Sequence, residues 1–129
     1  MIAHVRTADG LAVVDLDDET VLALDDTGVF EPAATPAVSL PRLVAAAAAG
    51  STVVAVVDTK PPLAVSHDGG VTWRESGRGL PAGRAVAVAP DDPDLILYAA
   101  RNRLYLSRDG GRFWHGLAIE LPEIDAVAL

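Results

Sequence analysis

The chain has 129 residues, half of them hydrophobic, with no cysteine and a formal net charge of −8. This length fits one domain, and the hydrophobic content argues against a disordered chain. The lack of cysteine excludes disulfides and thiolate metal sites, and the acidic balance argues against binding to nucleic acid. The first thirty residues carry seven acidic groups, unlike a signal peptide, and no apolar stretch is long enough for a membrane helix. We therefore expect a soluble, cytoplasmic domain without cofactor, metal, nucleic-acid or membrane partners.

Short runs rich in valine and alanine, separated by turn residues, indicate β-strands along the whole chain. In chain order, the expected strands are 2–7, 11–15, 20–24 and 29–31, then 43–48, 52–58, 63–66 and 72–75, and finally 84–89, 95–100, 103–107 and 113–117. Segment 39–50 also has a helical alternative, because it combines an N-cap serine, an early proline, five consecutive alanines and a terminal glycine.

Two octapeptides, 66–73 and 107–114, share the pattern Ser-x-Asp-x-Gly-x-x-Trp and lie 41 residues apart. A degraded third copy is expected at 25–30. The dipeptide Leu-Pro recurs with the same period, at 40–41, 80–81 and 121–122, and a small apolar run follows each one. The alanine run at 45–48 therefore occupies the same place as the alternating runs 85–88 and 126–129, which favours a strand over the helix.

A period of about 40 to 45 residues with four strands in each unit is typical of β-propeller blades. The sequence therefore predicts an all-β fold of three four-stranded antiparallel blades, at 1–40, 41–81 and 82–122, followed by one extra inner strand at 123–129. Because three blades do not close a ring, two explanations stay open. Two copies associate into a six-bladed ring, with 123–129 added to a sheet of the other copy, or the chain is part of a longer propeller.

The octapeptide resembles the Asp-box, or BNR repeat, which lies on the turn between the third and fourth strands of many propeller blades. The resemblance is strong over residues 40–129 and weak over 1–39, where Leu24 and Glu31 replace the serine and the tryptophan. It implies a structural role, at the outer rim of the blades, for eight residues: Ser66, Asp68, Gly70, Trp73, Ser107, Asp109, Gly111 and Trp114. The alternative, a catalytic or calcium-binding role for Asp68 and Asp109, is disfavoured because each box offers one carboxylate only.

The resembling blades occur in photosystem assembly and stability factor-like proteins, sortilin-type receptors, sialidases and xyloglucan-cleaving glycosidases. Since these proteins have unrelated activities, the motif indicates a fold and not a function. We expect a non-catalytic module for protein binding, scaffolding or assembly. The alternative is part of a carbohydrate-binding or glycoside-hydrolase propeller.

Charge gives the clearest functional indication in the sequence. Residues 1–40 carry eight acidic groups and one arginine, whereas the rest of the chain is nearly balanced. Loops expected on one face of the second and third blades hold six basic residues: Arg42, Lys60, Arg78, Arg84, Arg101 and Arg103. The equivalent loop of the first blade is expected to be the acidic turn 17–19. The sequence thus predicts a charged face for an acidic protein partner or for a second copy of the chain.

Overall fold

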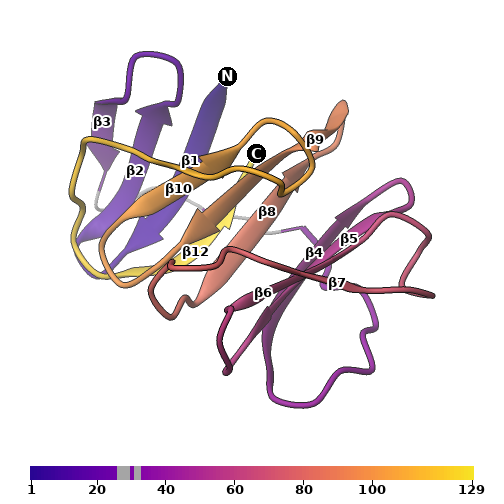
Figure 1. The fold of residues 1–129 in the computed structure, drawn as a ribbon. Coiled ribbons are helices and arrows are strands. Elements are labelled where there is room, and N and C mark those ends of the chain that lie inside the picture. Colours follow the sequence, from indigo (N-terminus) through magenta and orange to yellow (C-terminus); the bar gives the residue numbers. More distant parts are fainter. Residues whose placement is uncertain (26–29, 31–32) are drawn as a thin grey trace.

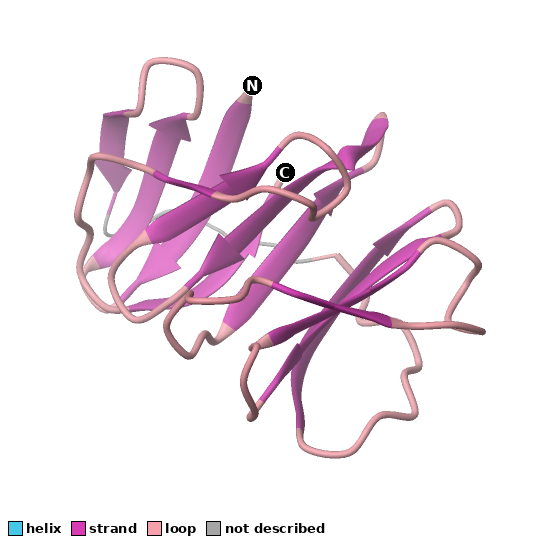
Figure 2. Cartoon of the chain, viewed as in Figure 1, coloured by secondary structure: helices cyan, strands magenta, loops and turns pink. Residues whose placement is uncertain are grey.

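In the residues that the computed structural model describes, all regular structure is β-strand, arranged in three four-stranded antiparallel sheets (Figures 1 and 2). The structure describes residues 1–25, 30 and 33–129. The strands are β1 (Ile2–Thr7), β2 (Gly10–Asp15), β3 (Thr20–Asp25), β4 (Leu43–Ala49), β5 (Thr52–Val57), β6 (Leu63–Ser66), β7 (Arg74–Ser76), β8 (Ala85–Ala89), β9 (Asp92–Ala99), β10 (Leu104–Ser107), β11 (His115–Gly116) and β12 (Ile124–Ala128). The prediction of an all-β fold with three four-stranded blades is confirmed. In the described part of the chain, no helix is long and apolar enough to cross a membrane.

The alanine run forms the strand β4 and not the alternative helix. It pairs with β5, so that Ala47 lies opposite Val54 and Ala45 opposite Val56. On its other side β4 packs near β8. Small side chains suit this position, because two sheets converge there, and packing therefore overrides the helical propensity of alanine.

The C-terminal strand β12 differs from the prediction of an extra strand beyond the third blade. It pairs with β1 of the same chain, with Val127 opposite Val5, and becomes the innermost strand of the sheet β12-β1-β2-β3. The strands β1, β2 and β3 are therefore the second, third and fourth of their sheet, one place further out than expected. The strand expected at 29–31 and the degraded box at 25–30 fall largely outside the described residues.

The three sheets stand side by side, with β8 of the sheet β8–β11 packed between the inner strands β4 and β12 (Figure 1). Two hydrophobic cores result. One lies between the sheets β12-β1-β2-β3 and β8–β11 and includes Val5, Val14 and Leu97. The other lies between the sheets β8–β11 and β4–β7 and includes Val54, Ile96 and Tyr98. Each face of the central sheet is thus covered, whereas each outer sheet has one face against which no sheet of the described residues packs.

The two ends of the strands differ in the loops that they carry. At the end that we call the box end lie the two octapeptide turns, 66–73 and 107–114. The acidic turn 16–19 also lies there, because Asp17 pairs with Arg108 at 2.9 Å and Glu19 with His115 at 3.1 Å. The turn was expected on the opposite face, beside the basic loops. The shift of the first sheet by one strand explains the difference, since 16–19 now joins the third strand to the fourth.

Candidate binding surfaces

In both octapeptide turns, 66–73 and 107–114, which we call the boxes, the serine and the aspartate bond to their own turn. Asp68 accepts hydrogen bonds from the Ser66 hydroxyl at 2.7 Å and from the Thr72 amide at 2.9 Å, and the Gly70 amide donates to Ser66 Oγ. Asp109 likewise accepts from the Ser107 hydroxyl at 2.8 Å and from the Phe113 amide at 3.0 Å. These bonds hold a tight turn in place, as side chains of this kind do when they satisfy nearby backbone groups.

The hydrogen bonds donated by Thr72 hold the pKa of the Asp68 carboxyl well below its usual range, and the Phe113 amide lowers the pKa of Asp109. A carboxyl whose pKa is depressed by folding stabilises the protein above its unfolded-state pKa and loses this contribution as pH falls toward the folded value. We therefore expect Asp68→Asn to lower the melting temperature at neutral pH, and the difference from the unmodified protein to shrink below about pH 4. Thermal unfolding over a pH series tests this, and a difference that does not depend on pH would contradict it.

The two box tryptophans lie in different surroundings. Trp114 packs between two sheets, where its indole Nε1 donates to Ser76 Oγ at 3.0 Å and its ring meets Tyr98 edge-on at 6.1 Å. In the same box, a methyl group added to Gly111 would lie only 3.1 Å from Val65 of the neighbouring sheet. Trp73 instead lies over its own Gly70, and alternation from the pair Val65–Arg74 places it on the face of the sheet β4–β7 away from the core, where no described sheet packs. One box is therefore docked and the other is not.

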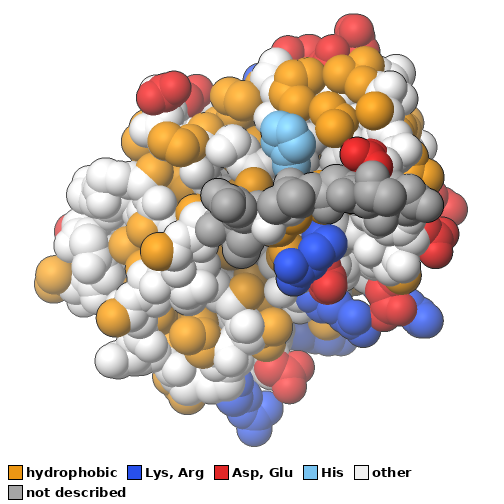
Figure 3. Space-filling view, turned by 180° about the vertical axis from the view of Figure 1, so that it is seen from behind, with side chains coloured by type: hydrophobic (Ala, Val, Ile, Leu, Met, Phe, Trp, Pro, Cys, Tyr) orange, Lys and Arg blue, Asp and Glu red, His pale blue; other side chains and the backbone are white. Residues whose placement is uncertain are grey.

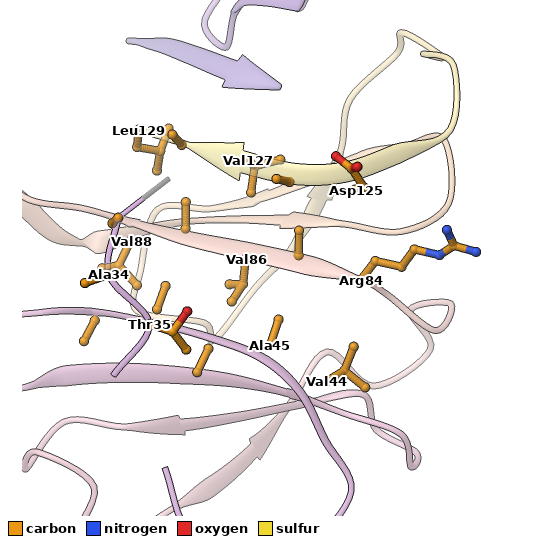
Figure 4. A pocket seen from close by; sticks show the side chains of 18 of the residues that line it. Ala34, Thr35, Val44, Ala45, Arg84, Val86, Val88, Asp125, Val127 and Leu129 are labelled. Atoms are coloured by element: carbon orange, nitrogen blue, oxygen red, sulfur yellow. The ribbon is translucent and has the colours of Figure 1, made fainter. Parts of the chain in front are cut away.

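A groove of about 480 Å³ runs along the inner strands (Figure 4). Its walls come from three parallel stretches of chain, 44–48, 84–88 and 125–129, with Ala33, Ala34 and Thr35 across them. Most of the lining side chains are alanine and valine. Among the described lining residues, Arg84 and Asp125 are charged, and the Asp125 carboxylate also pairs with Arg6 at 2.8 Å. The groove suits small apolar side chains. Glycoside hydrolysis commonly uses two carboxylates, and the described lining of this groove holds one.

The six basic residues predicted as a partner face lie in loops at the end opposite the box end, which we call the basic end. Arg42 and Arg84 each directly precede an inner strand, β4 and β8. Lys60 and Arg78 lie in two neighbouring loops of the sheet β4–β7, which together border shallow pockets. Arg101 and Arg103 lie in the loop between β9 and β10.

Acidic partners, which the sequence reasoning missed, neutralise part of this face. Glu123 binds Arg84 at 2.8 Å and lies 3.9 Å from Arg101, and Glu120 binds Arg103 at 3.1 Å. Arg42, Lys60 and Arg78 form no ion pair with any described residue. A signal for Glu123 was available, because it precedes the inner strand β12 as Arg84 precedes β8, and neighbouring inner strands bring such positions together.

No protein-family model matches the chain, and no curated protein does. Among solved structures, the GH74 enzyme of Niastella koreensis aligns with 92% of this chain and 17% of its own, with a TM-score of 0.48 and 22% sequence identity. The chain thus spans less than a fifth of the length of that enzyme.

Proposed function

We propose that this chain is a non-catalytic protein-binding module that holds an acidic segment of a partner protein at its basic end. The observation that carries the proposal is the separation of charge between the two ends of the strands. Six lysines and arginines occupy the loops of the basic end, where the described loops hold four acidic residues: Asp9, Asp58, Glu120 and Glu123. The box end carries most of the remaining acidic residues, among them 15–19 and 91–94. Such a distribution orients an acidic partner toward one end of the molecule.

The centre of the proposed contact is the pair Arg84 and Arg101. Both guanidinium groups point at Glu123, yet Arg101 remains 80% exposed and its contact is long, at 3.9 Å. Its remaining donors are therefore free to bind a carboxylate of a partner, and a planar guanidinium favours this kind of pairing. Arg84 also lines the apolar groove. A segment in which acidic residues alternate with small apolar ones would use the arginines and the groove together.

A binding measurement with a synthetic peptide tests the proposal. A fluorescent peptide of alternating glutamate and alanine is titrated with the protein, and anisotropy reports binding. Replacing Arg84 and Arg101 by glutamine is expected to raise Kd by about tenfold or more, since two charge-assisted contacts are lost. The matched control, Arg108→Gln with Arg112→Gln at the box end, changes the net charge equally and is expected to shift Kd by less than about twofold. Equal weakening by both pairs, or no binding at low salt, would contradict the proposed site.

A further inference from the structure

The contact between the sheets β4–β7 and β8–β11 shows what covers the box at 107–114 in this protein. Trp114 and Gly111 of one sheet pack on Val65 and Ser76 of the next, and the Ser76 hydroxyl both accepts from the indole and donates to the Gly111 carbonyl. The contact around this box therefore has two sides, one from each sheet. One sheet supplies the indole and the glycine turn, and the neighbouring sheet supplies an apolar surface with an acceptor at its outer strand.

The sheet β4–β7 carries a second indole and glycine turn, at Trp73 and Gly70, but no described sheet packs against it. The backbone registers place Ala48, Val53 and Ser66 on the face opposite to the core residues Val54 and Val65. Trp73 and Gly70 belong to this free side, and neighbouring Val71 is 80% exposed. Val53 and Ala55 are already buried. The exposed part of this side is therefore Val71, next to the half-buried Trp73, and we call these two residues the Trp73 rim.

The sheet β12-β1-β2-β3 presents a free face at the other end of the molecule. Its residues Val5, Ala12 and Val14 are in the core, so the opposite face, with the row His4, Val13 and Ala23, meets no other sheet. Ile2, which alternation along β1 places on the same face as His4, is 38% exposed. Figure 3 shows hydrophobic side chains gathered beside a histidine over this sheet. Apolar surface that is gathered in this way is a common feature of sites that bind another protein.

From these two faces we infer that a second copy of the chain packs its β12-β1-β2-β3 sheet against the Trp73 rim. The chain carries one face of each kind, at opposite ends of a row of three sheets, so a twofold axis forms the same contact twice and leaves neither face open. The Trp73 indole then gains the cover that Trp114 has within the chain. This pairing joins sheets face to face. It differs from the exchange of segment 123–129, one of the two alternatives left open by the sequence, because β12 is already paired with β1.

The mass of the protein in solution tests this inference. Variants in each of the two boxes show which box makes the contact. Light scattering at micromolar to near-millimolar concentration is expected to give the mass of two chains for the unmodified protein. Trp73→Glu is expected to give the mass of one chain. Val71→Glu is expected to do the same, and it keeps the test valid if Trp73→Glu does not fold. Phe113→Glu is the matched control, because Phe113 is 79% exposed in the other box, and it is expected to leave the mass of two chains unchanged.

Each other outcome overturns the inference. A single-chain mass for the unmodified protein at near-millimolar concentration excludes the second copy. If folded Trp73→Glu and Val71→Glu still have the mass of two chains, the contact between chains lies on another surface. If Phe113→Glu has the mass of one chain, the contact is made by the box at 107–114. None of these measurements involves the acidic peptide or the basic end, so the inference and the proposed function can fail separately.

Discussion

Gly83→Ala is expected to lower the free energy of unfolding by about 3 kcal/mol or more, and to prevent folding if the protein is only marginally stable. A methyl group at this position would lie 2.1 Å from Cε1 of Tyr98 and 2.2 Å from its hydroxyl oxygen. The ring cannot move aside easily, because Tyr98 is fully buried between two sheets and its hydroxyl donates to the Pro81 carbonyl at 2.7 Å. Burial also raises the pKa of Tyr98 to about 12, so the phenol remains a donor at all ordinary pH values.

Urea unfolding measures the effect of Gly83→Ala, and Gly79→Ala is its control. Gly79 has a φ of +88° and no atom within 4 Å of an added methyl group, so alanine there introduces backbone strain without a clash. We expect the control to cost about 1 to 2 kcal/mol, as for other L-residues in left-handed backbone. If the two variants lose the same stability, Tyr98 yields to the methyl group and the close packing at Gly83 does not limit the fold.

The strands could be predicted from the sequence because each carries local information. Runs of valine and alanine bounded by glycine, proline or aspartate predict the strands, and the spacing of the two box motifs gives the length of the repeating unit. The same local reasoning places Asp68 and Asp109 in their turns, since each bonds within four residues of itself. At β4, by contrast, local propensity offers a helix, and only the comparison with the equivalent runs in other units favours the strand that forms.

The partner of β12 could not be predicted in this way. An inner strand such as Ile124–Ala128 has a pattern that fits the innermost place of any sheet, and periodicity does not say which β-sheet edge it meets. The shift of the first sheet by one strand follows from this pairing, and it moves the acidic turn 16–19 to the box end. The ion pairs of Glu120 and Glu123 were missed for a related reason, because they depend on how loops from different sheets approach each other.

The two box tryptophans are expected to differ in their contribution to stability although the motif is the same. Trp114→Ala removes a ring that packs between two sheets and a hydrogen bond to Ser76, and should lower the free energy of unfolding by about 2 to 3 kcal/mol. Trp73→Ala removes a half-buried ring from a sheet face against which no described sheet packs, and should cost less, about 1 kcal/mol. Chemical unfolding at low micromolar concentration, where a weak pair of chains is dissociated, measures both.

Trp114→Phe separates the two contributions at the docked box. Phenylalanine keeps most of the apolar contact with Tyr98 but cannot donate to Ser76 Oγ, so this variant should lose about 1 kcal/mol, less than Trp114→Ala. Equal losses for Trp73→Ala and Trp114→Ala would contradict the distinction between a docked and an undocked box. At higher concentration the loss caused by Trp73→Ala should grow while that caused by Trp114→Ala stays constant, because association of two chains then adds to the stability that the Trp73 rim supports.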